Sequence, residues 1–281
     1  MSYQLSWLDK AKKLPQEILS RLDLRVFKSK TVSGIRHSSY RALIVGKGAE
    51  FFTSAFNGYF DQPARLDTRS GGSEWKIFIS NGSEDSTCLE PQNNIIYLKG
   101  QSAMHLSSFP EKTFDLIIFL WASELSQDIF SLLTNICHLL KVNGQFSIVT
   151  YLDGSPVLPL TILKKIIKEH KDWSLKMYKS TLPASASEFR KILEKARLCD
   201  VRIWKDSIAC DYPSADDVYN DIFIMEEGLF SDVVPPEYIH TIKREFIREL
   251  KTLSFPLKVT YDFVGASGSK TLMQWQVVPP A

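Results

Sequence analysis

Long hydrophobic runs and a strong charge of one sign are both missing from this sequence. The longest strongly apolar stretch, Leu116 to Ala122, is far shorter than the roughly 20 residues of a membrane-spanning helix. Lys and Arg total 34 against 32 Asp and Glu, which leaves a net charge of only +2. We therefore expect no membrane partner and, without a general basic excess, no nucleic-acid partner.

Cysteine and histidine are few, and none is spaced as in a metal site. The four cysteines include no Cys-x-x-Cys pair, and the five histidines include no His-Glu-x-x-His pattern. We predict no metal site and reduced, buried thiols, which fits a cytoplasmic protein. An excess of Lys and Arg up to Arg41 leaves a mitochondrial presequence as the alternative, although Asp9, Glu17 and Asp23 count against it.

What is present is the composition of a globular protein, with short apolar runs that alternate with helical patterns. Hydrophobic residues make up 44% and charged residues 23% of the 281 residues. Strands are predicted over residues 41–45, 74–79, 95–98, 114–120 and 145–150. Helices are predicted over 49–60 and 129–140, the second ended by Asn143–Gly144. The alternation indicates βαβ crossovers and a mainly parallel sheet covered on both faces.

The remainder of the chain has a more helical pattern. Helices are predicted over 158–173, 187–198 and, with a break at Pro235–Pro236, 214–253, and strands over 201–208, 257–264 and 272–277. We predict an N-terminal helix and connector over residues 1–40. One domain then follows over 41–281, with a helical cap inserted at about 211–254.

Three sequence landmarks occur in order between Ala42 and Thr150. They are Leu43-Ile-Val-Gly-Lys-Gly48 after the first strand, Phe114-Asp-Leu-Ile-Ile118 in the fourth and Leu140-Lys-Val-Asn-Gly144 before the fifth. With these landmarks the stretch resembles class I methyltransferases that depend on S-adenosylmethionine (SAM), in particular those of the methyltransferase type 11 family. The resemblance implies an α/β fold: a Rossmann-like sandwich with a mostly parallel seven-stranded sheet, helices on both faces and a late helical insertion.

The end of the chain extends this resemblance. The segment from Phe255 to Ala266, which follows the helical insertion, is similar to the ending of the malonyl-acyl-carrier-protein O-methyltransferases of biotin synthesis. The similarity implies SAM as cofactor and O-methylation of a carboxylate on a substrate bound to an acyl carrier protein. A carboxylate acceptor needs no general base, because positioning and desolvation supply most of the rate.

The resemblance also implies a SAM site in the loops after the first four strands, since ligands of parallel sheets bind beyond the carboxyl ends of the strands. The matching residues are Gly46, Gly48, Glu50, Ser80, Asn81, Gln101, Ser102 and Leu120. The chain departs from the family at Ile44, where an acid is usual, and at Glu50, the third glycine position. It also lacks the expected acid directly after the second strand and has Gln101 where an aspartate is common. Charge-assisted hydrogen bonds are roughly twice as strong as neutral ones, so these departures weaken the expected affinity for SAM.

Because of these departures, a second hypothesis stays open. A catalytically inactive methyltransferase-like protein would keep the fold and act as a binding, assembly or regulatory subunit. A carboxylate of Glu50 or Glu84 in the pocket would favour the enzyme. A pocket filled by Phe51, Phe52 or Trp121 would favour the inactive protein.

Candidate acceptor-binding residues follow the fourth and fifth strands. Trp121 and Glu124 follow the fourth strand, where the resembling family often has substrate-facing groups, and Tyr151 follows the fifth. Each also has an ordinary interpretation: Trp121 as a core residue, Glu124 as a solvated acid and Tyr151 as an aromatic at the end of a sheet.

One predicted helix face is basic. It carries Lys164, Lys165, Lys168 and Lys171. An acyl carrier protein or another acidic protein is the predicted partner, because a basic surface near the site would steer an acidic one. A solvated helix face with no partner is the alternative.

Overall fold

The computed structural model describes eleven stretches of the chain, which together contain the strands and helices discussed below. They are residues 15–16, 18–22, 40–46, 49, 51–52, 75–80, 95–98, 109–122, 128–170, 182–221 and 236–270. The strands are β1 (Tyr40–Val45), β2 (Trp75–Ser80), β3 (Ile95–Tyr97), β4 (Phe114–Phe119), β5 (Leu140–Tyr151), β6 (Cys199–Tyr212) and β7 (Leu257–Ser269). The helices with bounds are α5 (Ile129–Leu139), α6 (Val157–Glu169), α7 (Ala186–Lys195) and α9 (Pro236–Leu250).

The strands form one seven-stranded sheet in the order β3-β2-β1-β4-β5-β7-β6. The pairs from β3 to β5 are parallel, and β7 runs antiparallel to both β5 and β6. Parallel neighbours need a crossover connection, which explains the alternation of strands and helices along the chain. The predicted α/β class with a mostly parallel seven-stranded sheet is confirmed.

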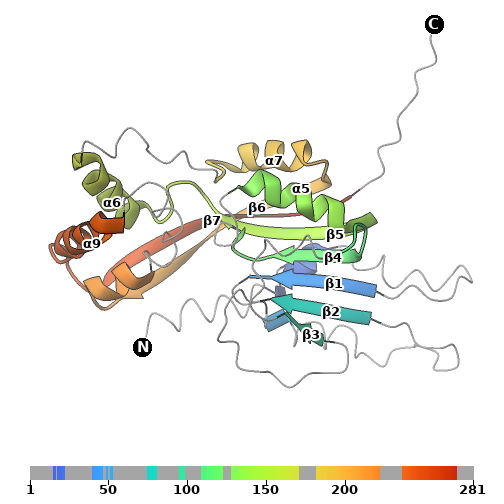
Figure 1. Ribbon diagram of the computed structural model, residues 1–281, viewed down its shortest axis with the longest axis horizontal. Helices are drawn as coiled ribbons and strands as arrows, with labels where there is room; N and C mark the ends of the chain where they lie inside the picture. Colours follow the sequence, from blue (N-terminus) through green and yellow to red (C-terminus); the bar gives the residue numbers. More distant parts are fainter. Residues whose placement is uncertain are drawn as a thin grey trace, which may run out of the picture.

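Each face of the sheet has its own apolar cluster. β4 lies at the centre and is buried along its whole length, as its apolar sequence, interrupted by one acid, Asp115, predicts. On one face the strands pack against α5 and α7, which lie side by side (Figure 1). On the other face Ile18, Leu19 and Leu22 of the N-terminal segment join the cluster that contains Ile44 and Ile118. Helical structure therefore covers both faces.

The ends of α5 show why this helix begins and stops where it does. Asp128 is its N-cap, and the carboxylate accepts hydrogen bonds from the backbone N–H groups of Phe130 and Ser131. At the other end Lys270 donates from Nζ to the carbonyl oxygens of Cys137 and Leu140, at 2.6 and 2.9 Å. A cation at a helix C-terminus also suits the helix dipole. Lys270, which directly follows β7, thus caps the C-terminus of α5.

The segment around Asn143–Gly144 differs from the prediction. α5 stops at Leu139, and β5 begins at Leu140 instead of residue 145. Asn143 has a φ of 61°, and its N–H donates to the carbonyl of Lys270 at 2.7 Å, while the Lys270 N–H donates to Gly144 at 2.9 Å. These residues therefore form an irregular, bulged start of β5, where the register with β4 also shifts. Asn and Gly adopt positive φ both in bulges and at helix ends, so the pair Asn143–Gly144 alone does not distinguish a bulged strand from a helix end.

Other boundaries also shift. β6 and β7 are longer than predicted, because the two strands pair with each other over nearly their whole length. The predicted helix over 214–253 contains a helical stretch at residues 215–221 and, later, α9. The last predicted strand, residues 272–277, lies outside the described residues, as do most of the predicted helix over 49–60 and most of the 1–40 segment.

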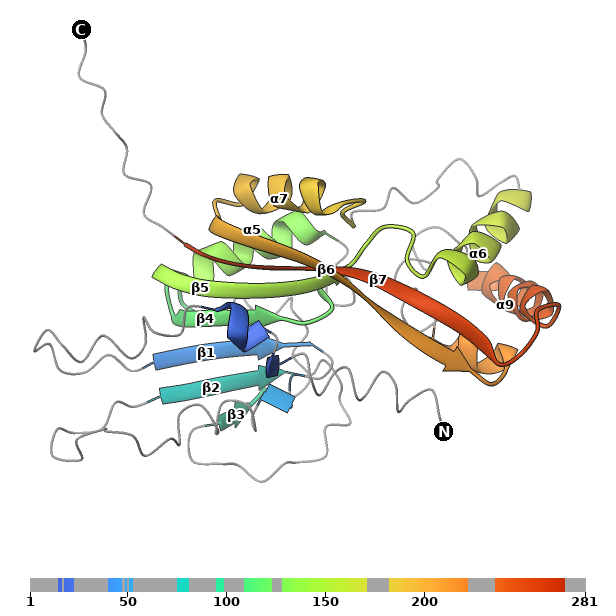
Figure 2. The same ribbon diagram turned by 180° about the vertical axis from the view of Figure 1, so that it is seen from behind.

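β6 and β7 extend beyond the sheet as a two-stranded ribbon, with α6 and α9 packed at its far end (Figures 1 and 2). Apolar side chains of α6 and α9, such as Leu163 and Phe246, share one cluster with this end of β7. His170 Nε2 lies 3.0 Å from Glu245 Oε2 and joins the two helices at their polar edge. α6, which precedes the predicted insertion at about 211–254, is thus grouped with it in space; the limits of the cap stay a prediction.

Candidate functional site

Three of the predicted cofactor-binding residues meet at the carboxyl ends of β1, β2 and β4. The N–H of Gly46 donates to the carbonyl of Ser80, at 2.8 Å, and the N–H of Leu120 donates to the carbonyl of Val45, also at 2.8 Å. Ser80 is buried. These bonds fix the three strand ends against one another at the edge of the sheet where ligands of parallel α/β proteins bind.

Gly46 is required at this point by its conformation and its surroundings. Its φ is +116°, a region that side chains rarely adopt, and a Cβ there would overlap the carbonyl oxygen of Leu120. The N–H of Ala49 then donates to the Gly46 carbonyl, and that of Phe52 to the Ala49 carbonyl, at 3.0 and 3.1 Å. The chain therefore turns sharply after β1 and enters a helical segment at this edge of the sheet.

The position where the resembling family has an acid is fully apolar here. Ile44 pairs with Ile79 of β2 on one side and with Ile118 of β4 on the other, and all three side chains are buried in one cluster. No described carboxylate substitutes for the acid among these three strand positions. The end of β1 therefore offers no charge to this edge of the sheet.

Several predicted site residues cannot be located in space. Gly48, Glu50, Asn81, Gln101, Ser102 and Glu124 lie outside the described residues, and so does Glu84. Their assignment stays a prediction from the sequence.

Trp121 and Tyr151, the two described acceptor candidates, lie against each other. Their rings are stacked with centroids 5.0 Å apart and an interplanar angle of 19°. Phe263 of β7 meets the indole edge-on, at 5.4 Å and 77°. Trp121 is 1% exposed and Tyr151 is also buried. The fourth and fifth strands thus end in a tightly packed aromatic group, and Phe52 belongs to the same apolar cluster.

A buried polar group at the base of the α6–α9 end was missed by the sequence analysis. Tyr261 of β7 donates to Asp221 Oδ2 at 2.9 Å, and Tyr212 of β6 donates to the same carboxylate and touches the Tyr261 hydroxyl. Burial raises the pKa of both phenols well above the usual range, and the negative charge of Asp221 raises it further. The Tyr261 ring is 6.0 Å from that of Tyr151, so this group adjoins the acceptor candidates. Its members are 9 and 40 residues apart in sequence, and no local pattern links them.

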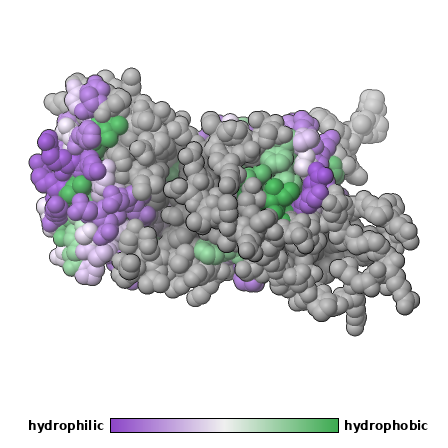
Figure 3. Space-filling view, turned by 60° about the horizontal axis from the view of Figure 1, so that its bottom comes forward, coloured by the Kyte–Doolittle hydropathy of each residue, from purple (hydrophilic) through white to green (hydrophobic). Residues whose placement is uncertain are grey.

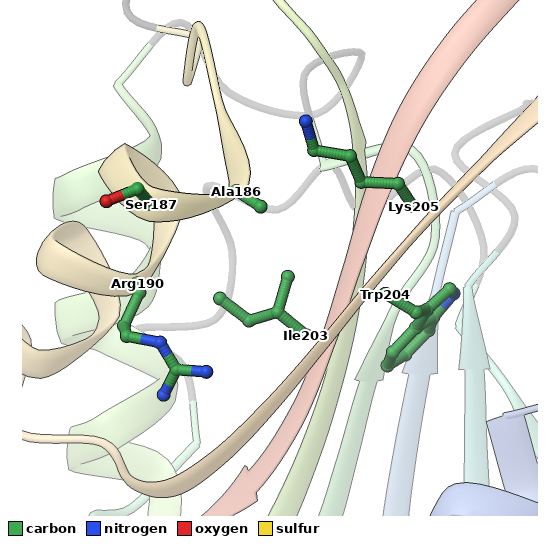
Figure 4. A pocket seen from close by; sticks show the side chains of 6 residues that line it. All are labelled: Ala186, Ser187, Arg190, Ile203, Trp204 and Lys205. Atoms are coloured by element: carbon green, nitrogen blue, oxygen red, sulfur yellow. The ribbon is translucent and has the colours of Figure 1, made fainter.

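A shallow pocket of about 320 Å³ lies elsewhere, between α7 and the outer strand β6. Its lining residues are Ala186, Ser187, Arg190, Ile203, Trp204 and Lys205 (Figure 4). Figure 4 shows Ser187 pointing away from the pocket, and Arg190 and Lys205 extending in different directions. Arg190 also donates to the carbonyl of Val201 at 3.0 Å. Because its polar groups do not converge, we assign no ligand to this pocket.

Among the described residues, no group of three or more His, Cys, Asp or Glu side chains could hold a metal ion. No helix in the described ranges is long and apolar enough to cross a membrane. Three cysteines are described, all as free thiols; Cys210 is buried as predicted, whereas Cys137 and Cys199 are partly exposed. The prediction of burial is wrong for these two, because Cys137 lies in the last turn of α5 and Cys199 begins the outer strand β6, where neither is fully covered.

The basic residues of α6 lie on its exposed face. Lys164, Lys165 and Lys168 are all exposed, and Lys171 lies outside the described residues. The exposed basic residues of α9 and the turn after it are Lys243, Arg244, Arg248 and Lys251. Figure 3 shows a largely hydrophilic surface at this end of the molecule, with a few hydrophobic residues among the polar ones. The predicted basic face is therefore accessible.

Comparisons with known proteins identify the fold. No family model and no curated protein matches the chain. Among solved structures, loganic acid methyltransferase with S-adenosylhomocysteine (SAH) has a TM-score of 0.60 at 10% identity, over 97% of this chain and 96% of that one. The YcgJ protein of Bacillus subtilis has a TM-score of 0.47 at 16% identity, over 88% and 97%.

Another similar structure is phosphoethanolamine N-methyltransferase 2 of Haemonchus contortus in complex with SAM. Its TM-score is 0.43 at 11% identity, over 88% of this chain and 52% of that one. The agreement with loganic acid methyltransferase extends over nearly all of both chains. The protein therefore has the Rossmann-like class I methyltransferase fold, and its structural neighbours include methyltransferases with bound SAM or SAH.

Proposed function

We propose that the protein is a SAM-dependent methyltransferase. The observation that carries this proposal is the meeting of Gly46, Ser80 and Leu120 at the carboxyl edge of a sheet with this fold. The residues fit the cofactor in one testable respect: the Ser80 hydroxyl lies at the end of β2, beside the Gly46 turn, and a hydroxyl can hydrogen-bond a ribose hydroxyl.

The proposed cofactor supplies an activated methyl group on a sulfonium sulfur. The backbone of Gly46 and Gly48 would lie against the cofactor, while Ser80 and Asn81 would bind its ribose hydroxyls. Gln101 and Ser102 would bind the adenine, and the Glu50 carboxylate would face the sulfonium charge. Neutral donors replace acids at most of these positions, so we expect binding weaker than carboxylate partners would give.

We further propose that the acceptor is a carboxylate on an acyl chain. Trp121, Tyr151 and Phe263 provide an apolar wall at the ends of β4, β5 and β7. Such a wall excludes water from an acceptor oxygen, and a carboxylate nucleophile needs no proton removed. An acyl carrier protein is the proposed donor of this substrate, supported by the exposed lysines of α6.

One observation favours a second candidate, a methyltransferase-like protein without catalytic activity. Ile44 replaces the usual acid and is buried among isoleucines, and Phe52 and Trp121 are both buried in the same cluster. Such a protein would keep the fold and act as a binding, assembly or regulatory subunit.

Turnover separates the two candidates. SAM is incubated with the protein and either malonyl-acyl carrier protein or malonyl-coenzyme A, and SAH formation is measured. An enzyme forms SAH and methyl ester in equal amounts. If SAM binds but no SAH forms above the rate without protein, the proposed malonyl acceptor is wrong and the inactive candidate is favoured.

The carrier-protein proposal has its own variants. The triple charge reversal K164E/K165E/K168E should lower turnover with malonyl-acyl carrier protein at least tenfold and leave turnover with malonyl-coenzyme A unchanged, because only the protein partner reaches α6. K191E, which alters an exposed lysine of α7, is the matched control and should change neither rate. Equal rates for the triple variant and the control would contradict a role for α6.

A further inference from the structure

Trp121 has a backbone conformation unusual for a buried aromatic residue. Its φ is 53°, in the left-handed region, yet it is only 1% exposed. The other described non-glycine residues with positive φ are Lys112, Asn143, Arg197 and Asp200, and all of these are exposed. A left-handed conformation is strained for such a residue and persists only where surrounding structure enforces it. At Trp121 it turns the chain at the carboxyl end of β4.

The indole N–H of Trp121 is a buried donor without an acceptor among the described residues. Buried polar groups are almost always hydrogen-bonded, so an unpaired one needs an explanation. The rings of Tyr151 and Phe263 pack against two sides of the Trp121 indole. Neither residue accepts a hydrogen bond from the indole N–H. The strained backbone and the unpaired donor thus occur in one residue, at the edge where ligands of this fold class bind.

We infer that the Trp121 indole N–H binds a carboxylate oxygen of a ligand. This proposal rests on the proposed function, and both ligands of that function carry a carboxylate: the methionyl group of SAM and SAH, and the acyl acceptor. A hydrogen bond to an anion is stronger than one to a neutral group and compensates for the loss of water around the donor. Stacking on Tyr151 fixes the direction of the N–H, which makes Trp121 a binding residue and Tyr151 a positioning residue.

Trp204 provides a matched control. Its indole N–H also lacks an acceptor among the described residues, but it lies on the outer strand β6, where the ring covers Gly265 and is itself covered by the Arg21 guanidinium at 4.5 Å. Trp204 has no positive φ and is only partly buried. The variants W121F and W204F each remove one unpaired N–H and keep an aromatic ring.

The test measures affinities by calorimetry for wild type, W121F and W204F, first for SAH and then for hexanoate at saturating SAH. About tenfold weaker binding of one ligand by W121F, with W204F unchanged, supports the proposal. A change for SAH identifies the cofactor carboxylate as the acceptor, and a change for hexanoate identifies the acyl carboxylate. If wild type binds SAH and W121F matches wild type for both ligands, the proposal is overturned.

A second measurement uses wild-type protein and does not depend on the folding of a variant. In a ¹H–¹⁵N spectrum, the Trp121 indole signal should move downfield when the carboxylate that it binds is added, and the Trp204 signal should stay in place. An unmoved Trp121 signal in a sample that binds SAH overturns the proposal. Absence of SAH binding to folded wild type overturns the proposed function itself, so the two failures are distinguishable.

Discussion

The carbonyl oxygen of Leu120 lies where a β-carbon on Gly46 would have to be. This close approach joins the end of β1 to the end of β4, and the Leu120 N–H reinforces it through its bond to the Val45 carbonyl at 2.8 Å. The glycine is thus required by the close packing of β1 against β4.

G46A should lower the free energy of unfolding by about 2–4 kcal/mol, because the new methyl group overlaps backbone and φ is unfavourable for alanine. The measurement is urea unfolding followed by circular dichroism. G154A is the control: Gly154 also has a positive φ, 80°, but nothing lies within 4 Å of an added Cβ. It should lose only about 1 kcal/mol. Equal losses in both variants would mean that the contact with Leu120 is not restrictive.

The buried pair Asp115–Lys141 should stabilise the opposite, amino-terminal edge of the central strands. Asp115 Oδ2 lies 2.6 Å from Lys141 Nζ and accepts the Arg41 N–H at 3.0 Å, with the Asp115 side chain 7% exposed and that of Lys141 32%. K141M should cost about 2–4 kcal/mol, since it leaves the buried Asp115 carboxylate without its cation. D115N should cost less, about 1–2 kcal/mol, because the Lys141 side chain that it leaves unpaired is partly exposed to water. The double variant should cost less than the sum of the two.

An exposed ion pair serves as the control for the Asp115–Lys141 measurement. His138 and Glu111 lie 3.9 Å apart with both side chains largely exposed, so E111Q should change the free energy of unfolding by less than about 0.5 kcal/mol. Additive losses in the Asp115–Lys141 cycle would show that the two groups do not interact energetically.

The tyrosine pair around Asp221 predicts a loss of stability in alkali. Burial raises the pKa of Tyr212 and Tyr261 above their usual value of about 10. The unfolded chain therefore releases phenol protons above pH 10 that the folded chain retains, and stability falls by about 1.4 kcal/mol per pH unit for each tyrosine. Below pH 10 both phenols are protonated in the folded and the unfolded chain, so they cause no change of stability with pH there.

Y261F isolates one of the two phenols. It should be less stable than wild type at pH 7 by about 1–2 kcal/mol, through the lost bond to Asp221. The difference should then narrow by about 1.4 kcal/mol per pH unit above pH 10, because the variant has one fewer proton to lose. Urea unfolding between pH 7 and pH 11.5 measures it, and a difference that stays constant over this range would contradict the assignment.

The central strands could be predicted because buried strands are short runs of mostly apolar residues, which the sequence shows directly. Phe114 to Phe119 contains a single acid, Asp115, and that acid is at the amino-terminal end where Lys141 can reach it. The start of β5 could not be predicted, since Asn143 is paired with Lys270, a residue 127 positions later in the chain. Long-range backbone pairing of this kind leaves no local pattern.

The candidate site divides in the same way. Gly46 and Leu120 follow apolar runs that end at the same edge of a parallel sheet, so their proximity follows from topology. The stacking of Trp121 on Tyr151 depends on side-chain directions, and the Tyr212–Tyr261–Asp221 group depends on the pairing of β6 with β7. Neither could be inferred from spacing along the chain.

The most direct test of the account is isothermal calorimetry of the folded protein with SAM and with SAH, up to millimolar ligand. We expect saturable binding of both at a single site per chain, weakened by G46A and unchanged by G154A. Absence of binding heat at millimolar ligand, in protein whose circular dichroism and unfolding transition are native, would contradict a SAM site at the carboxyl edge of this sheet.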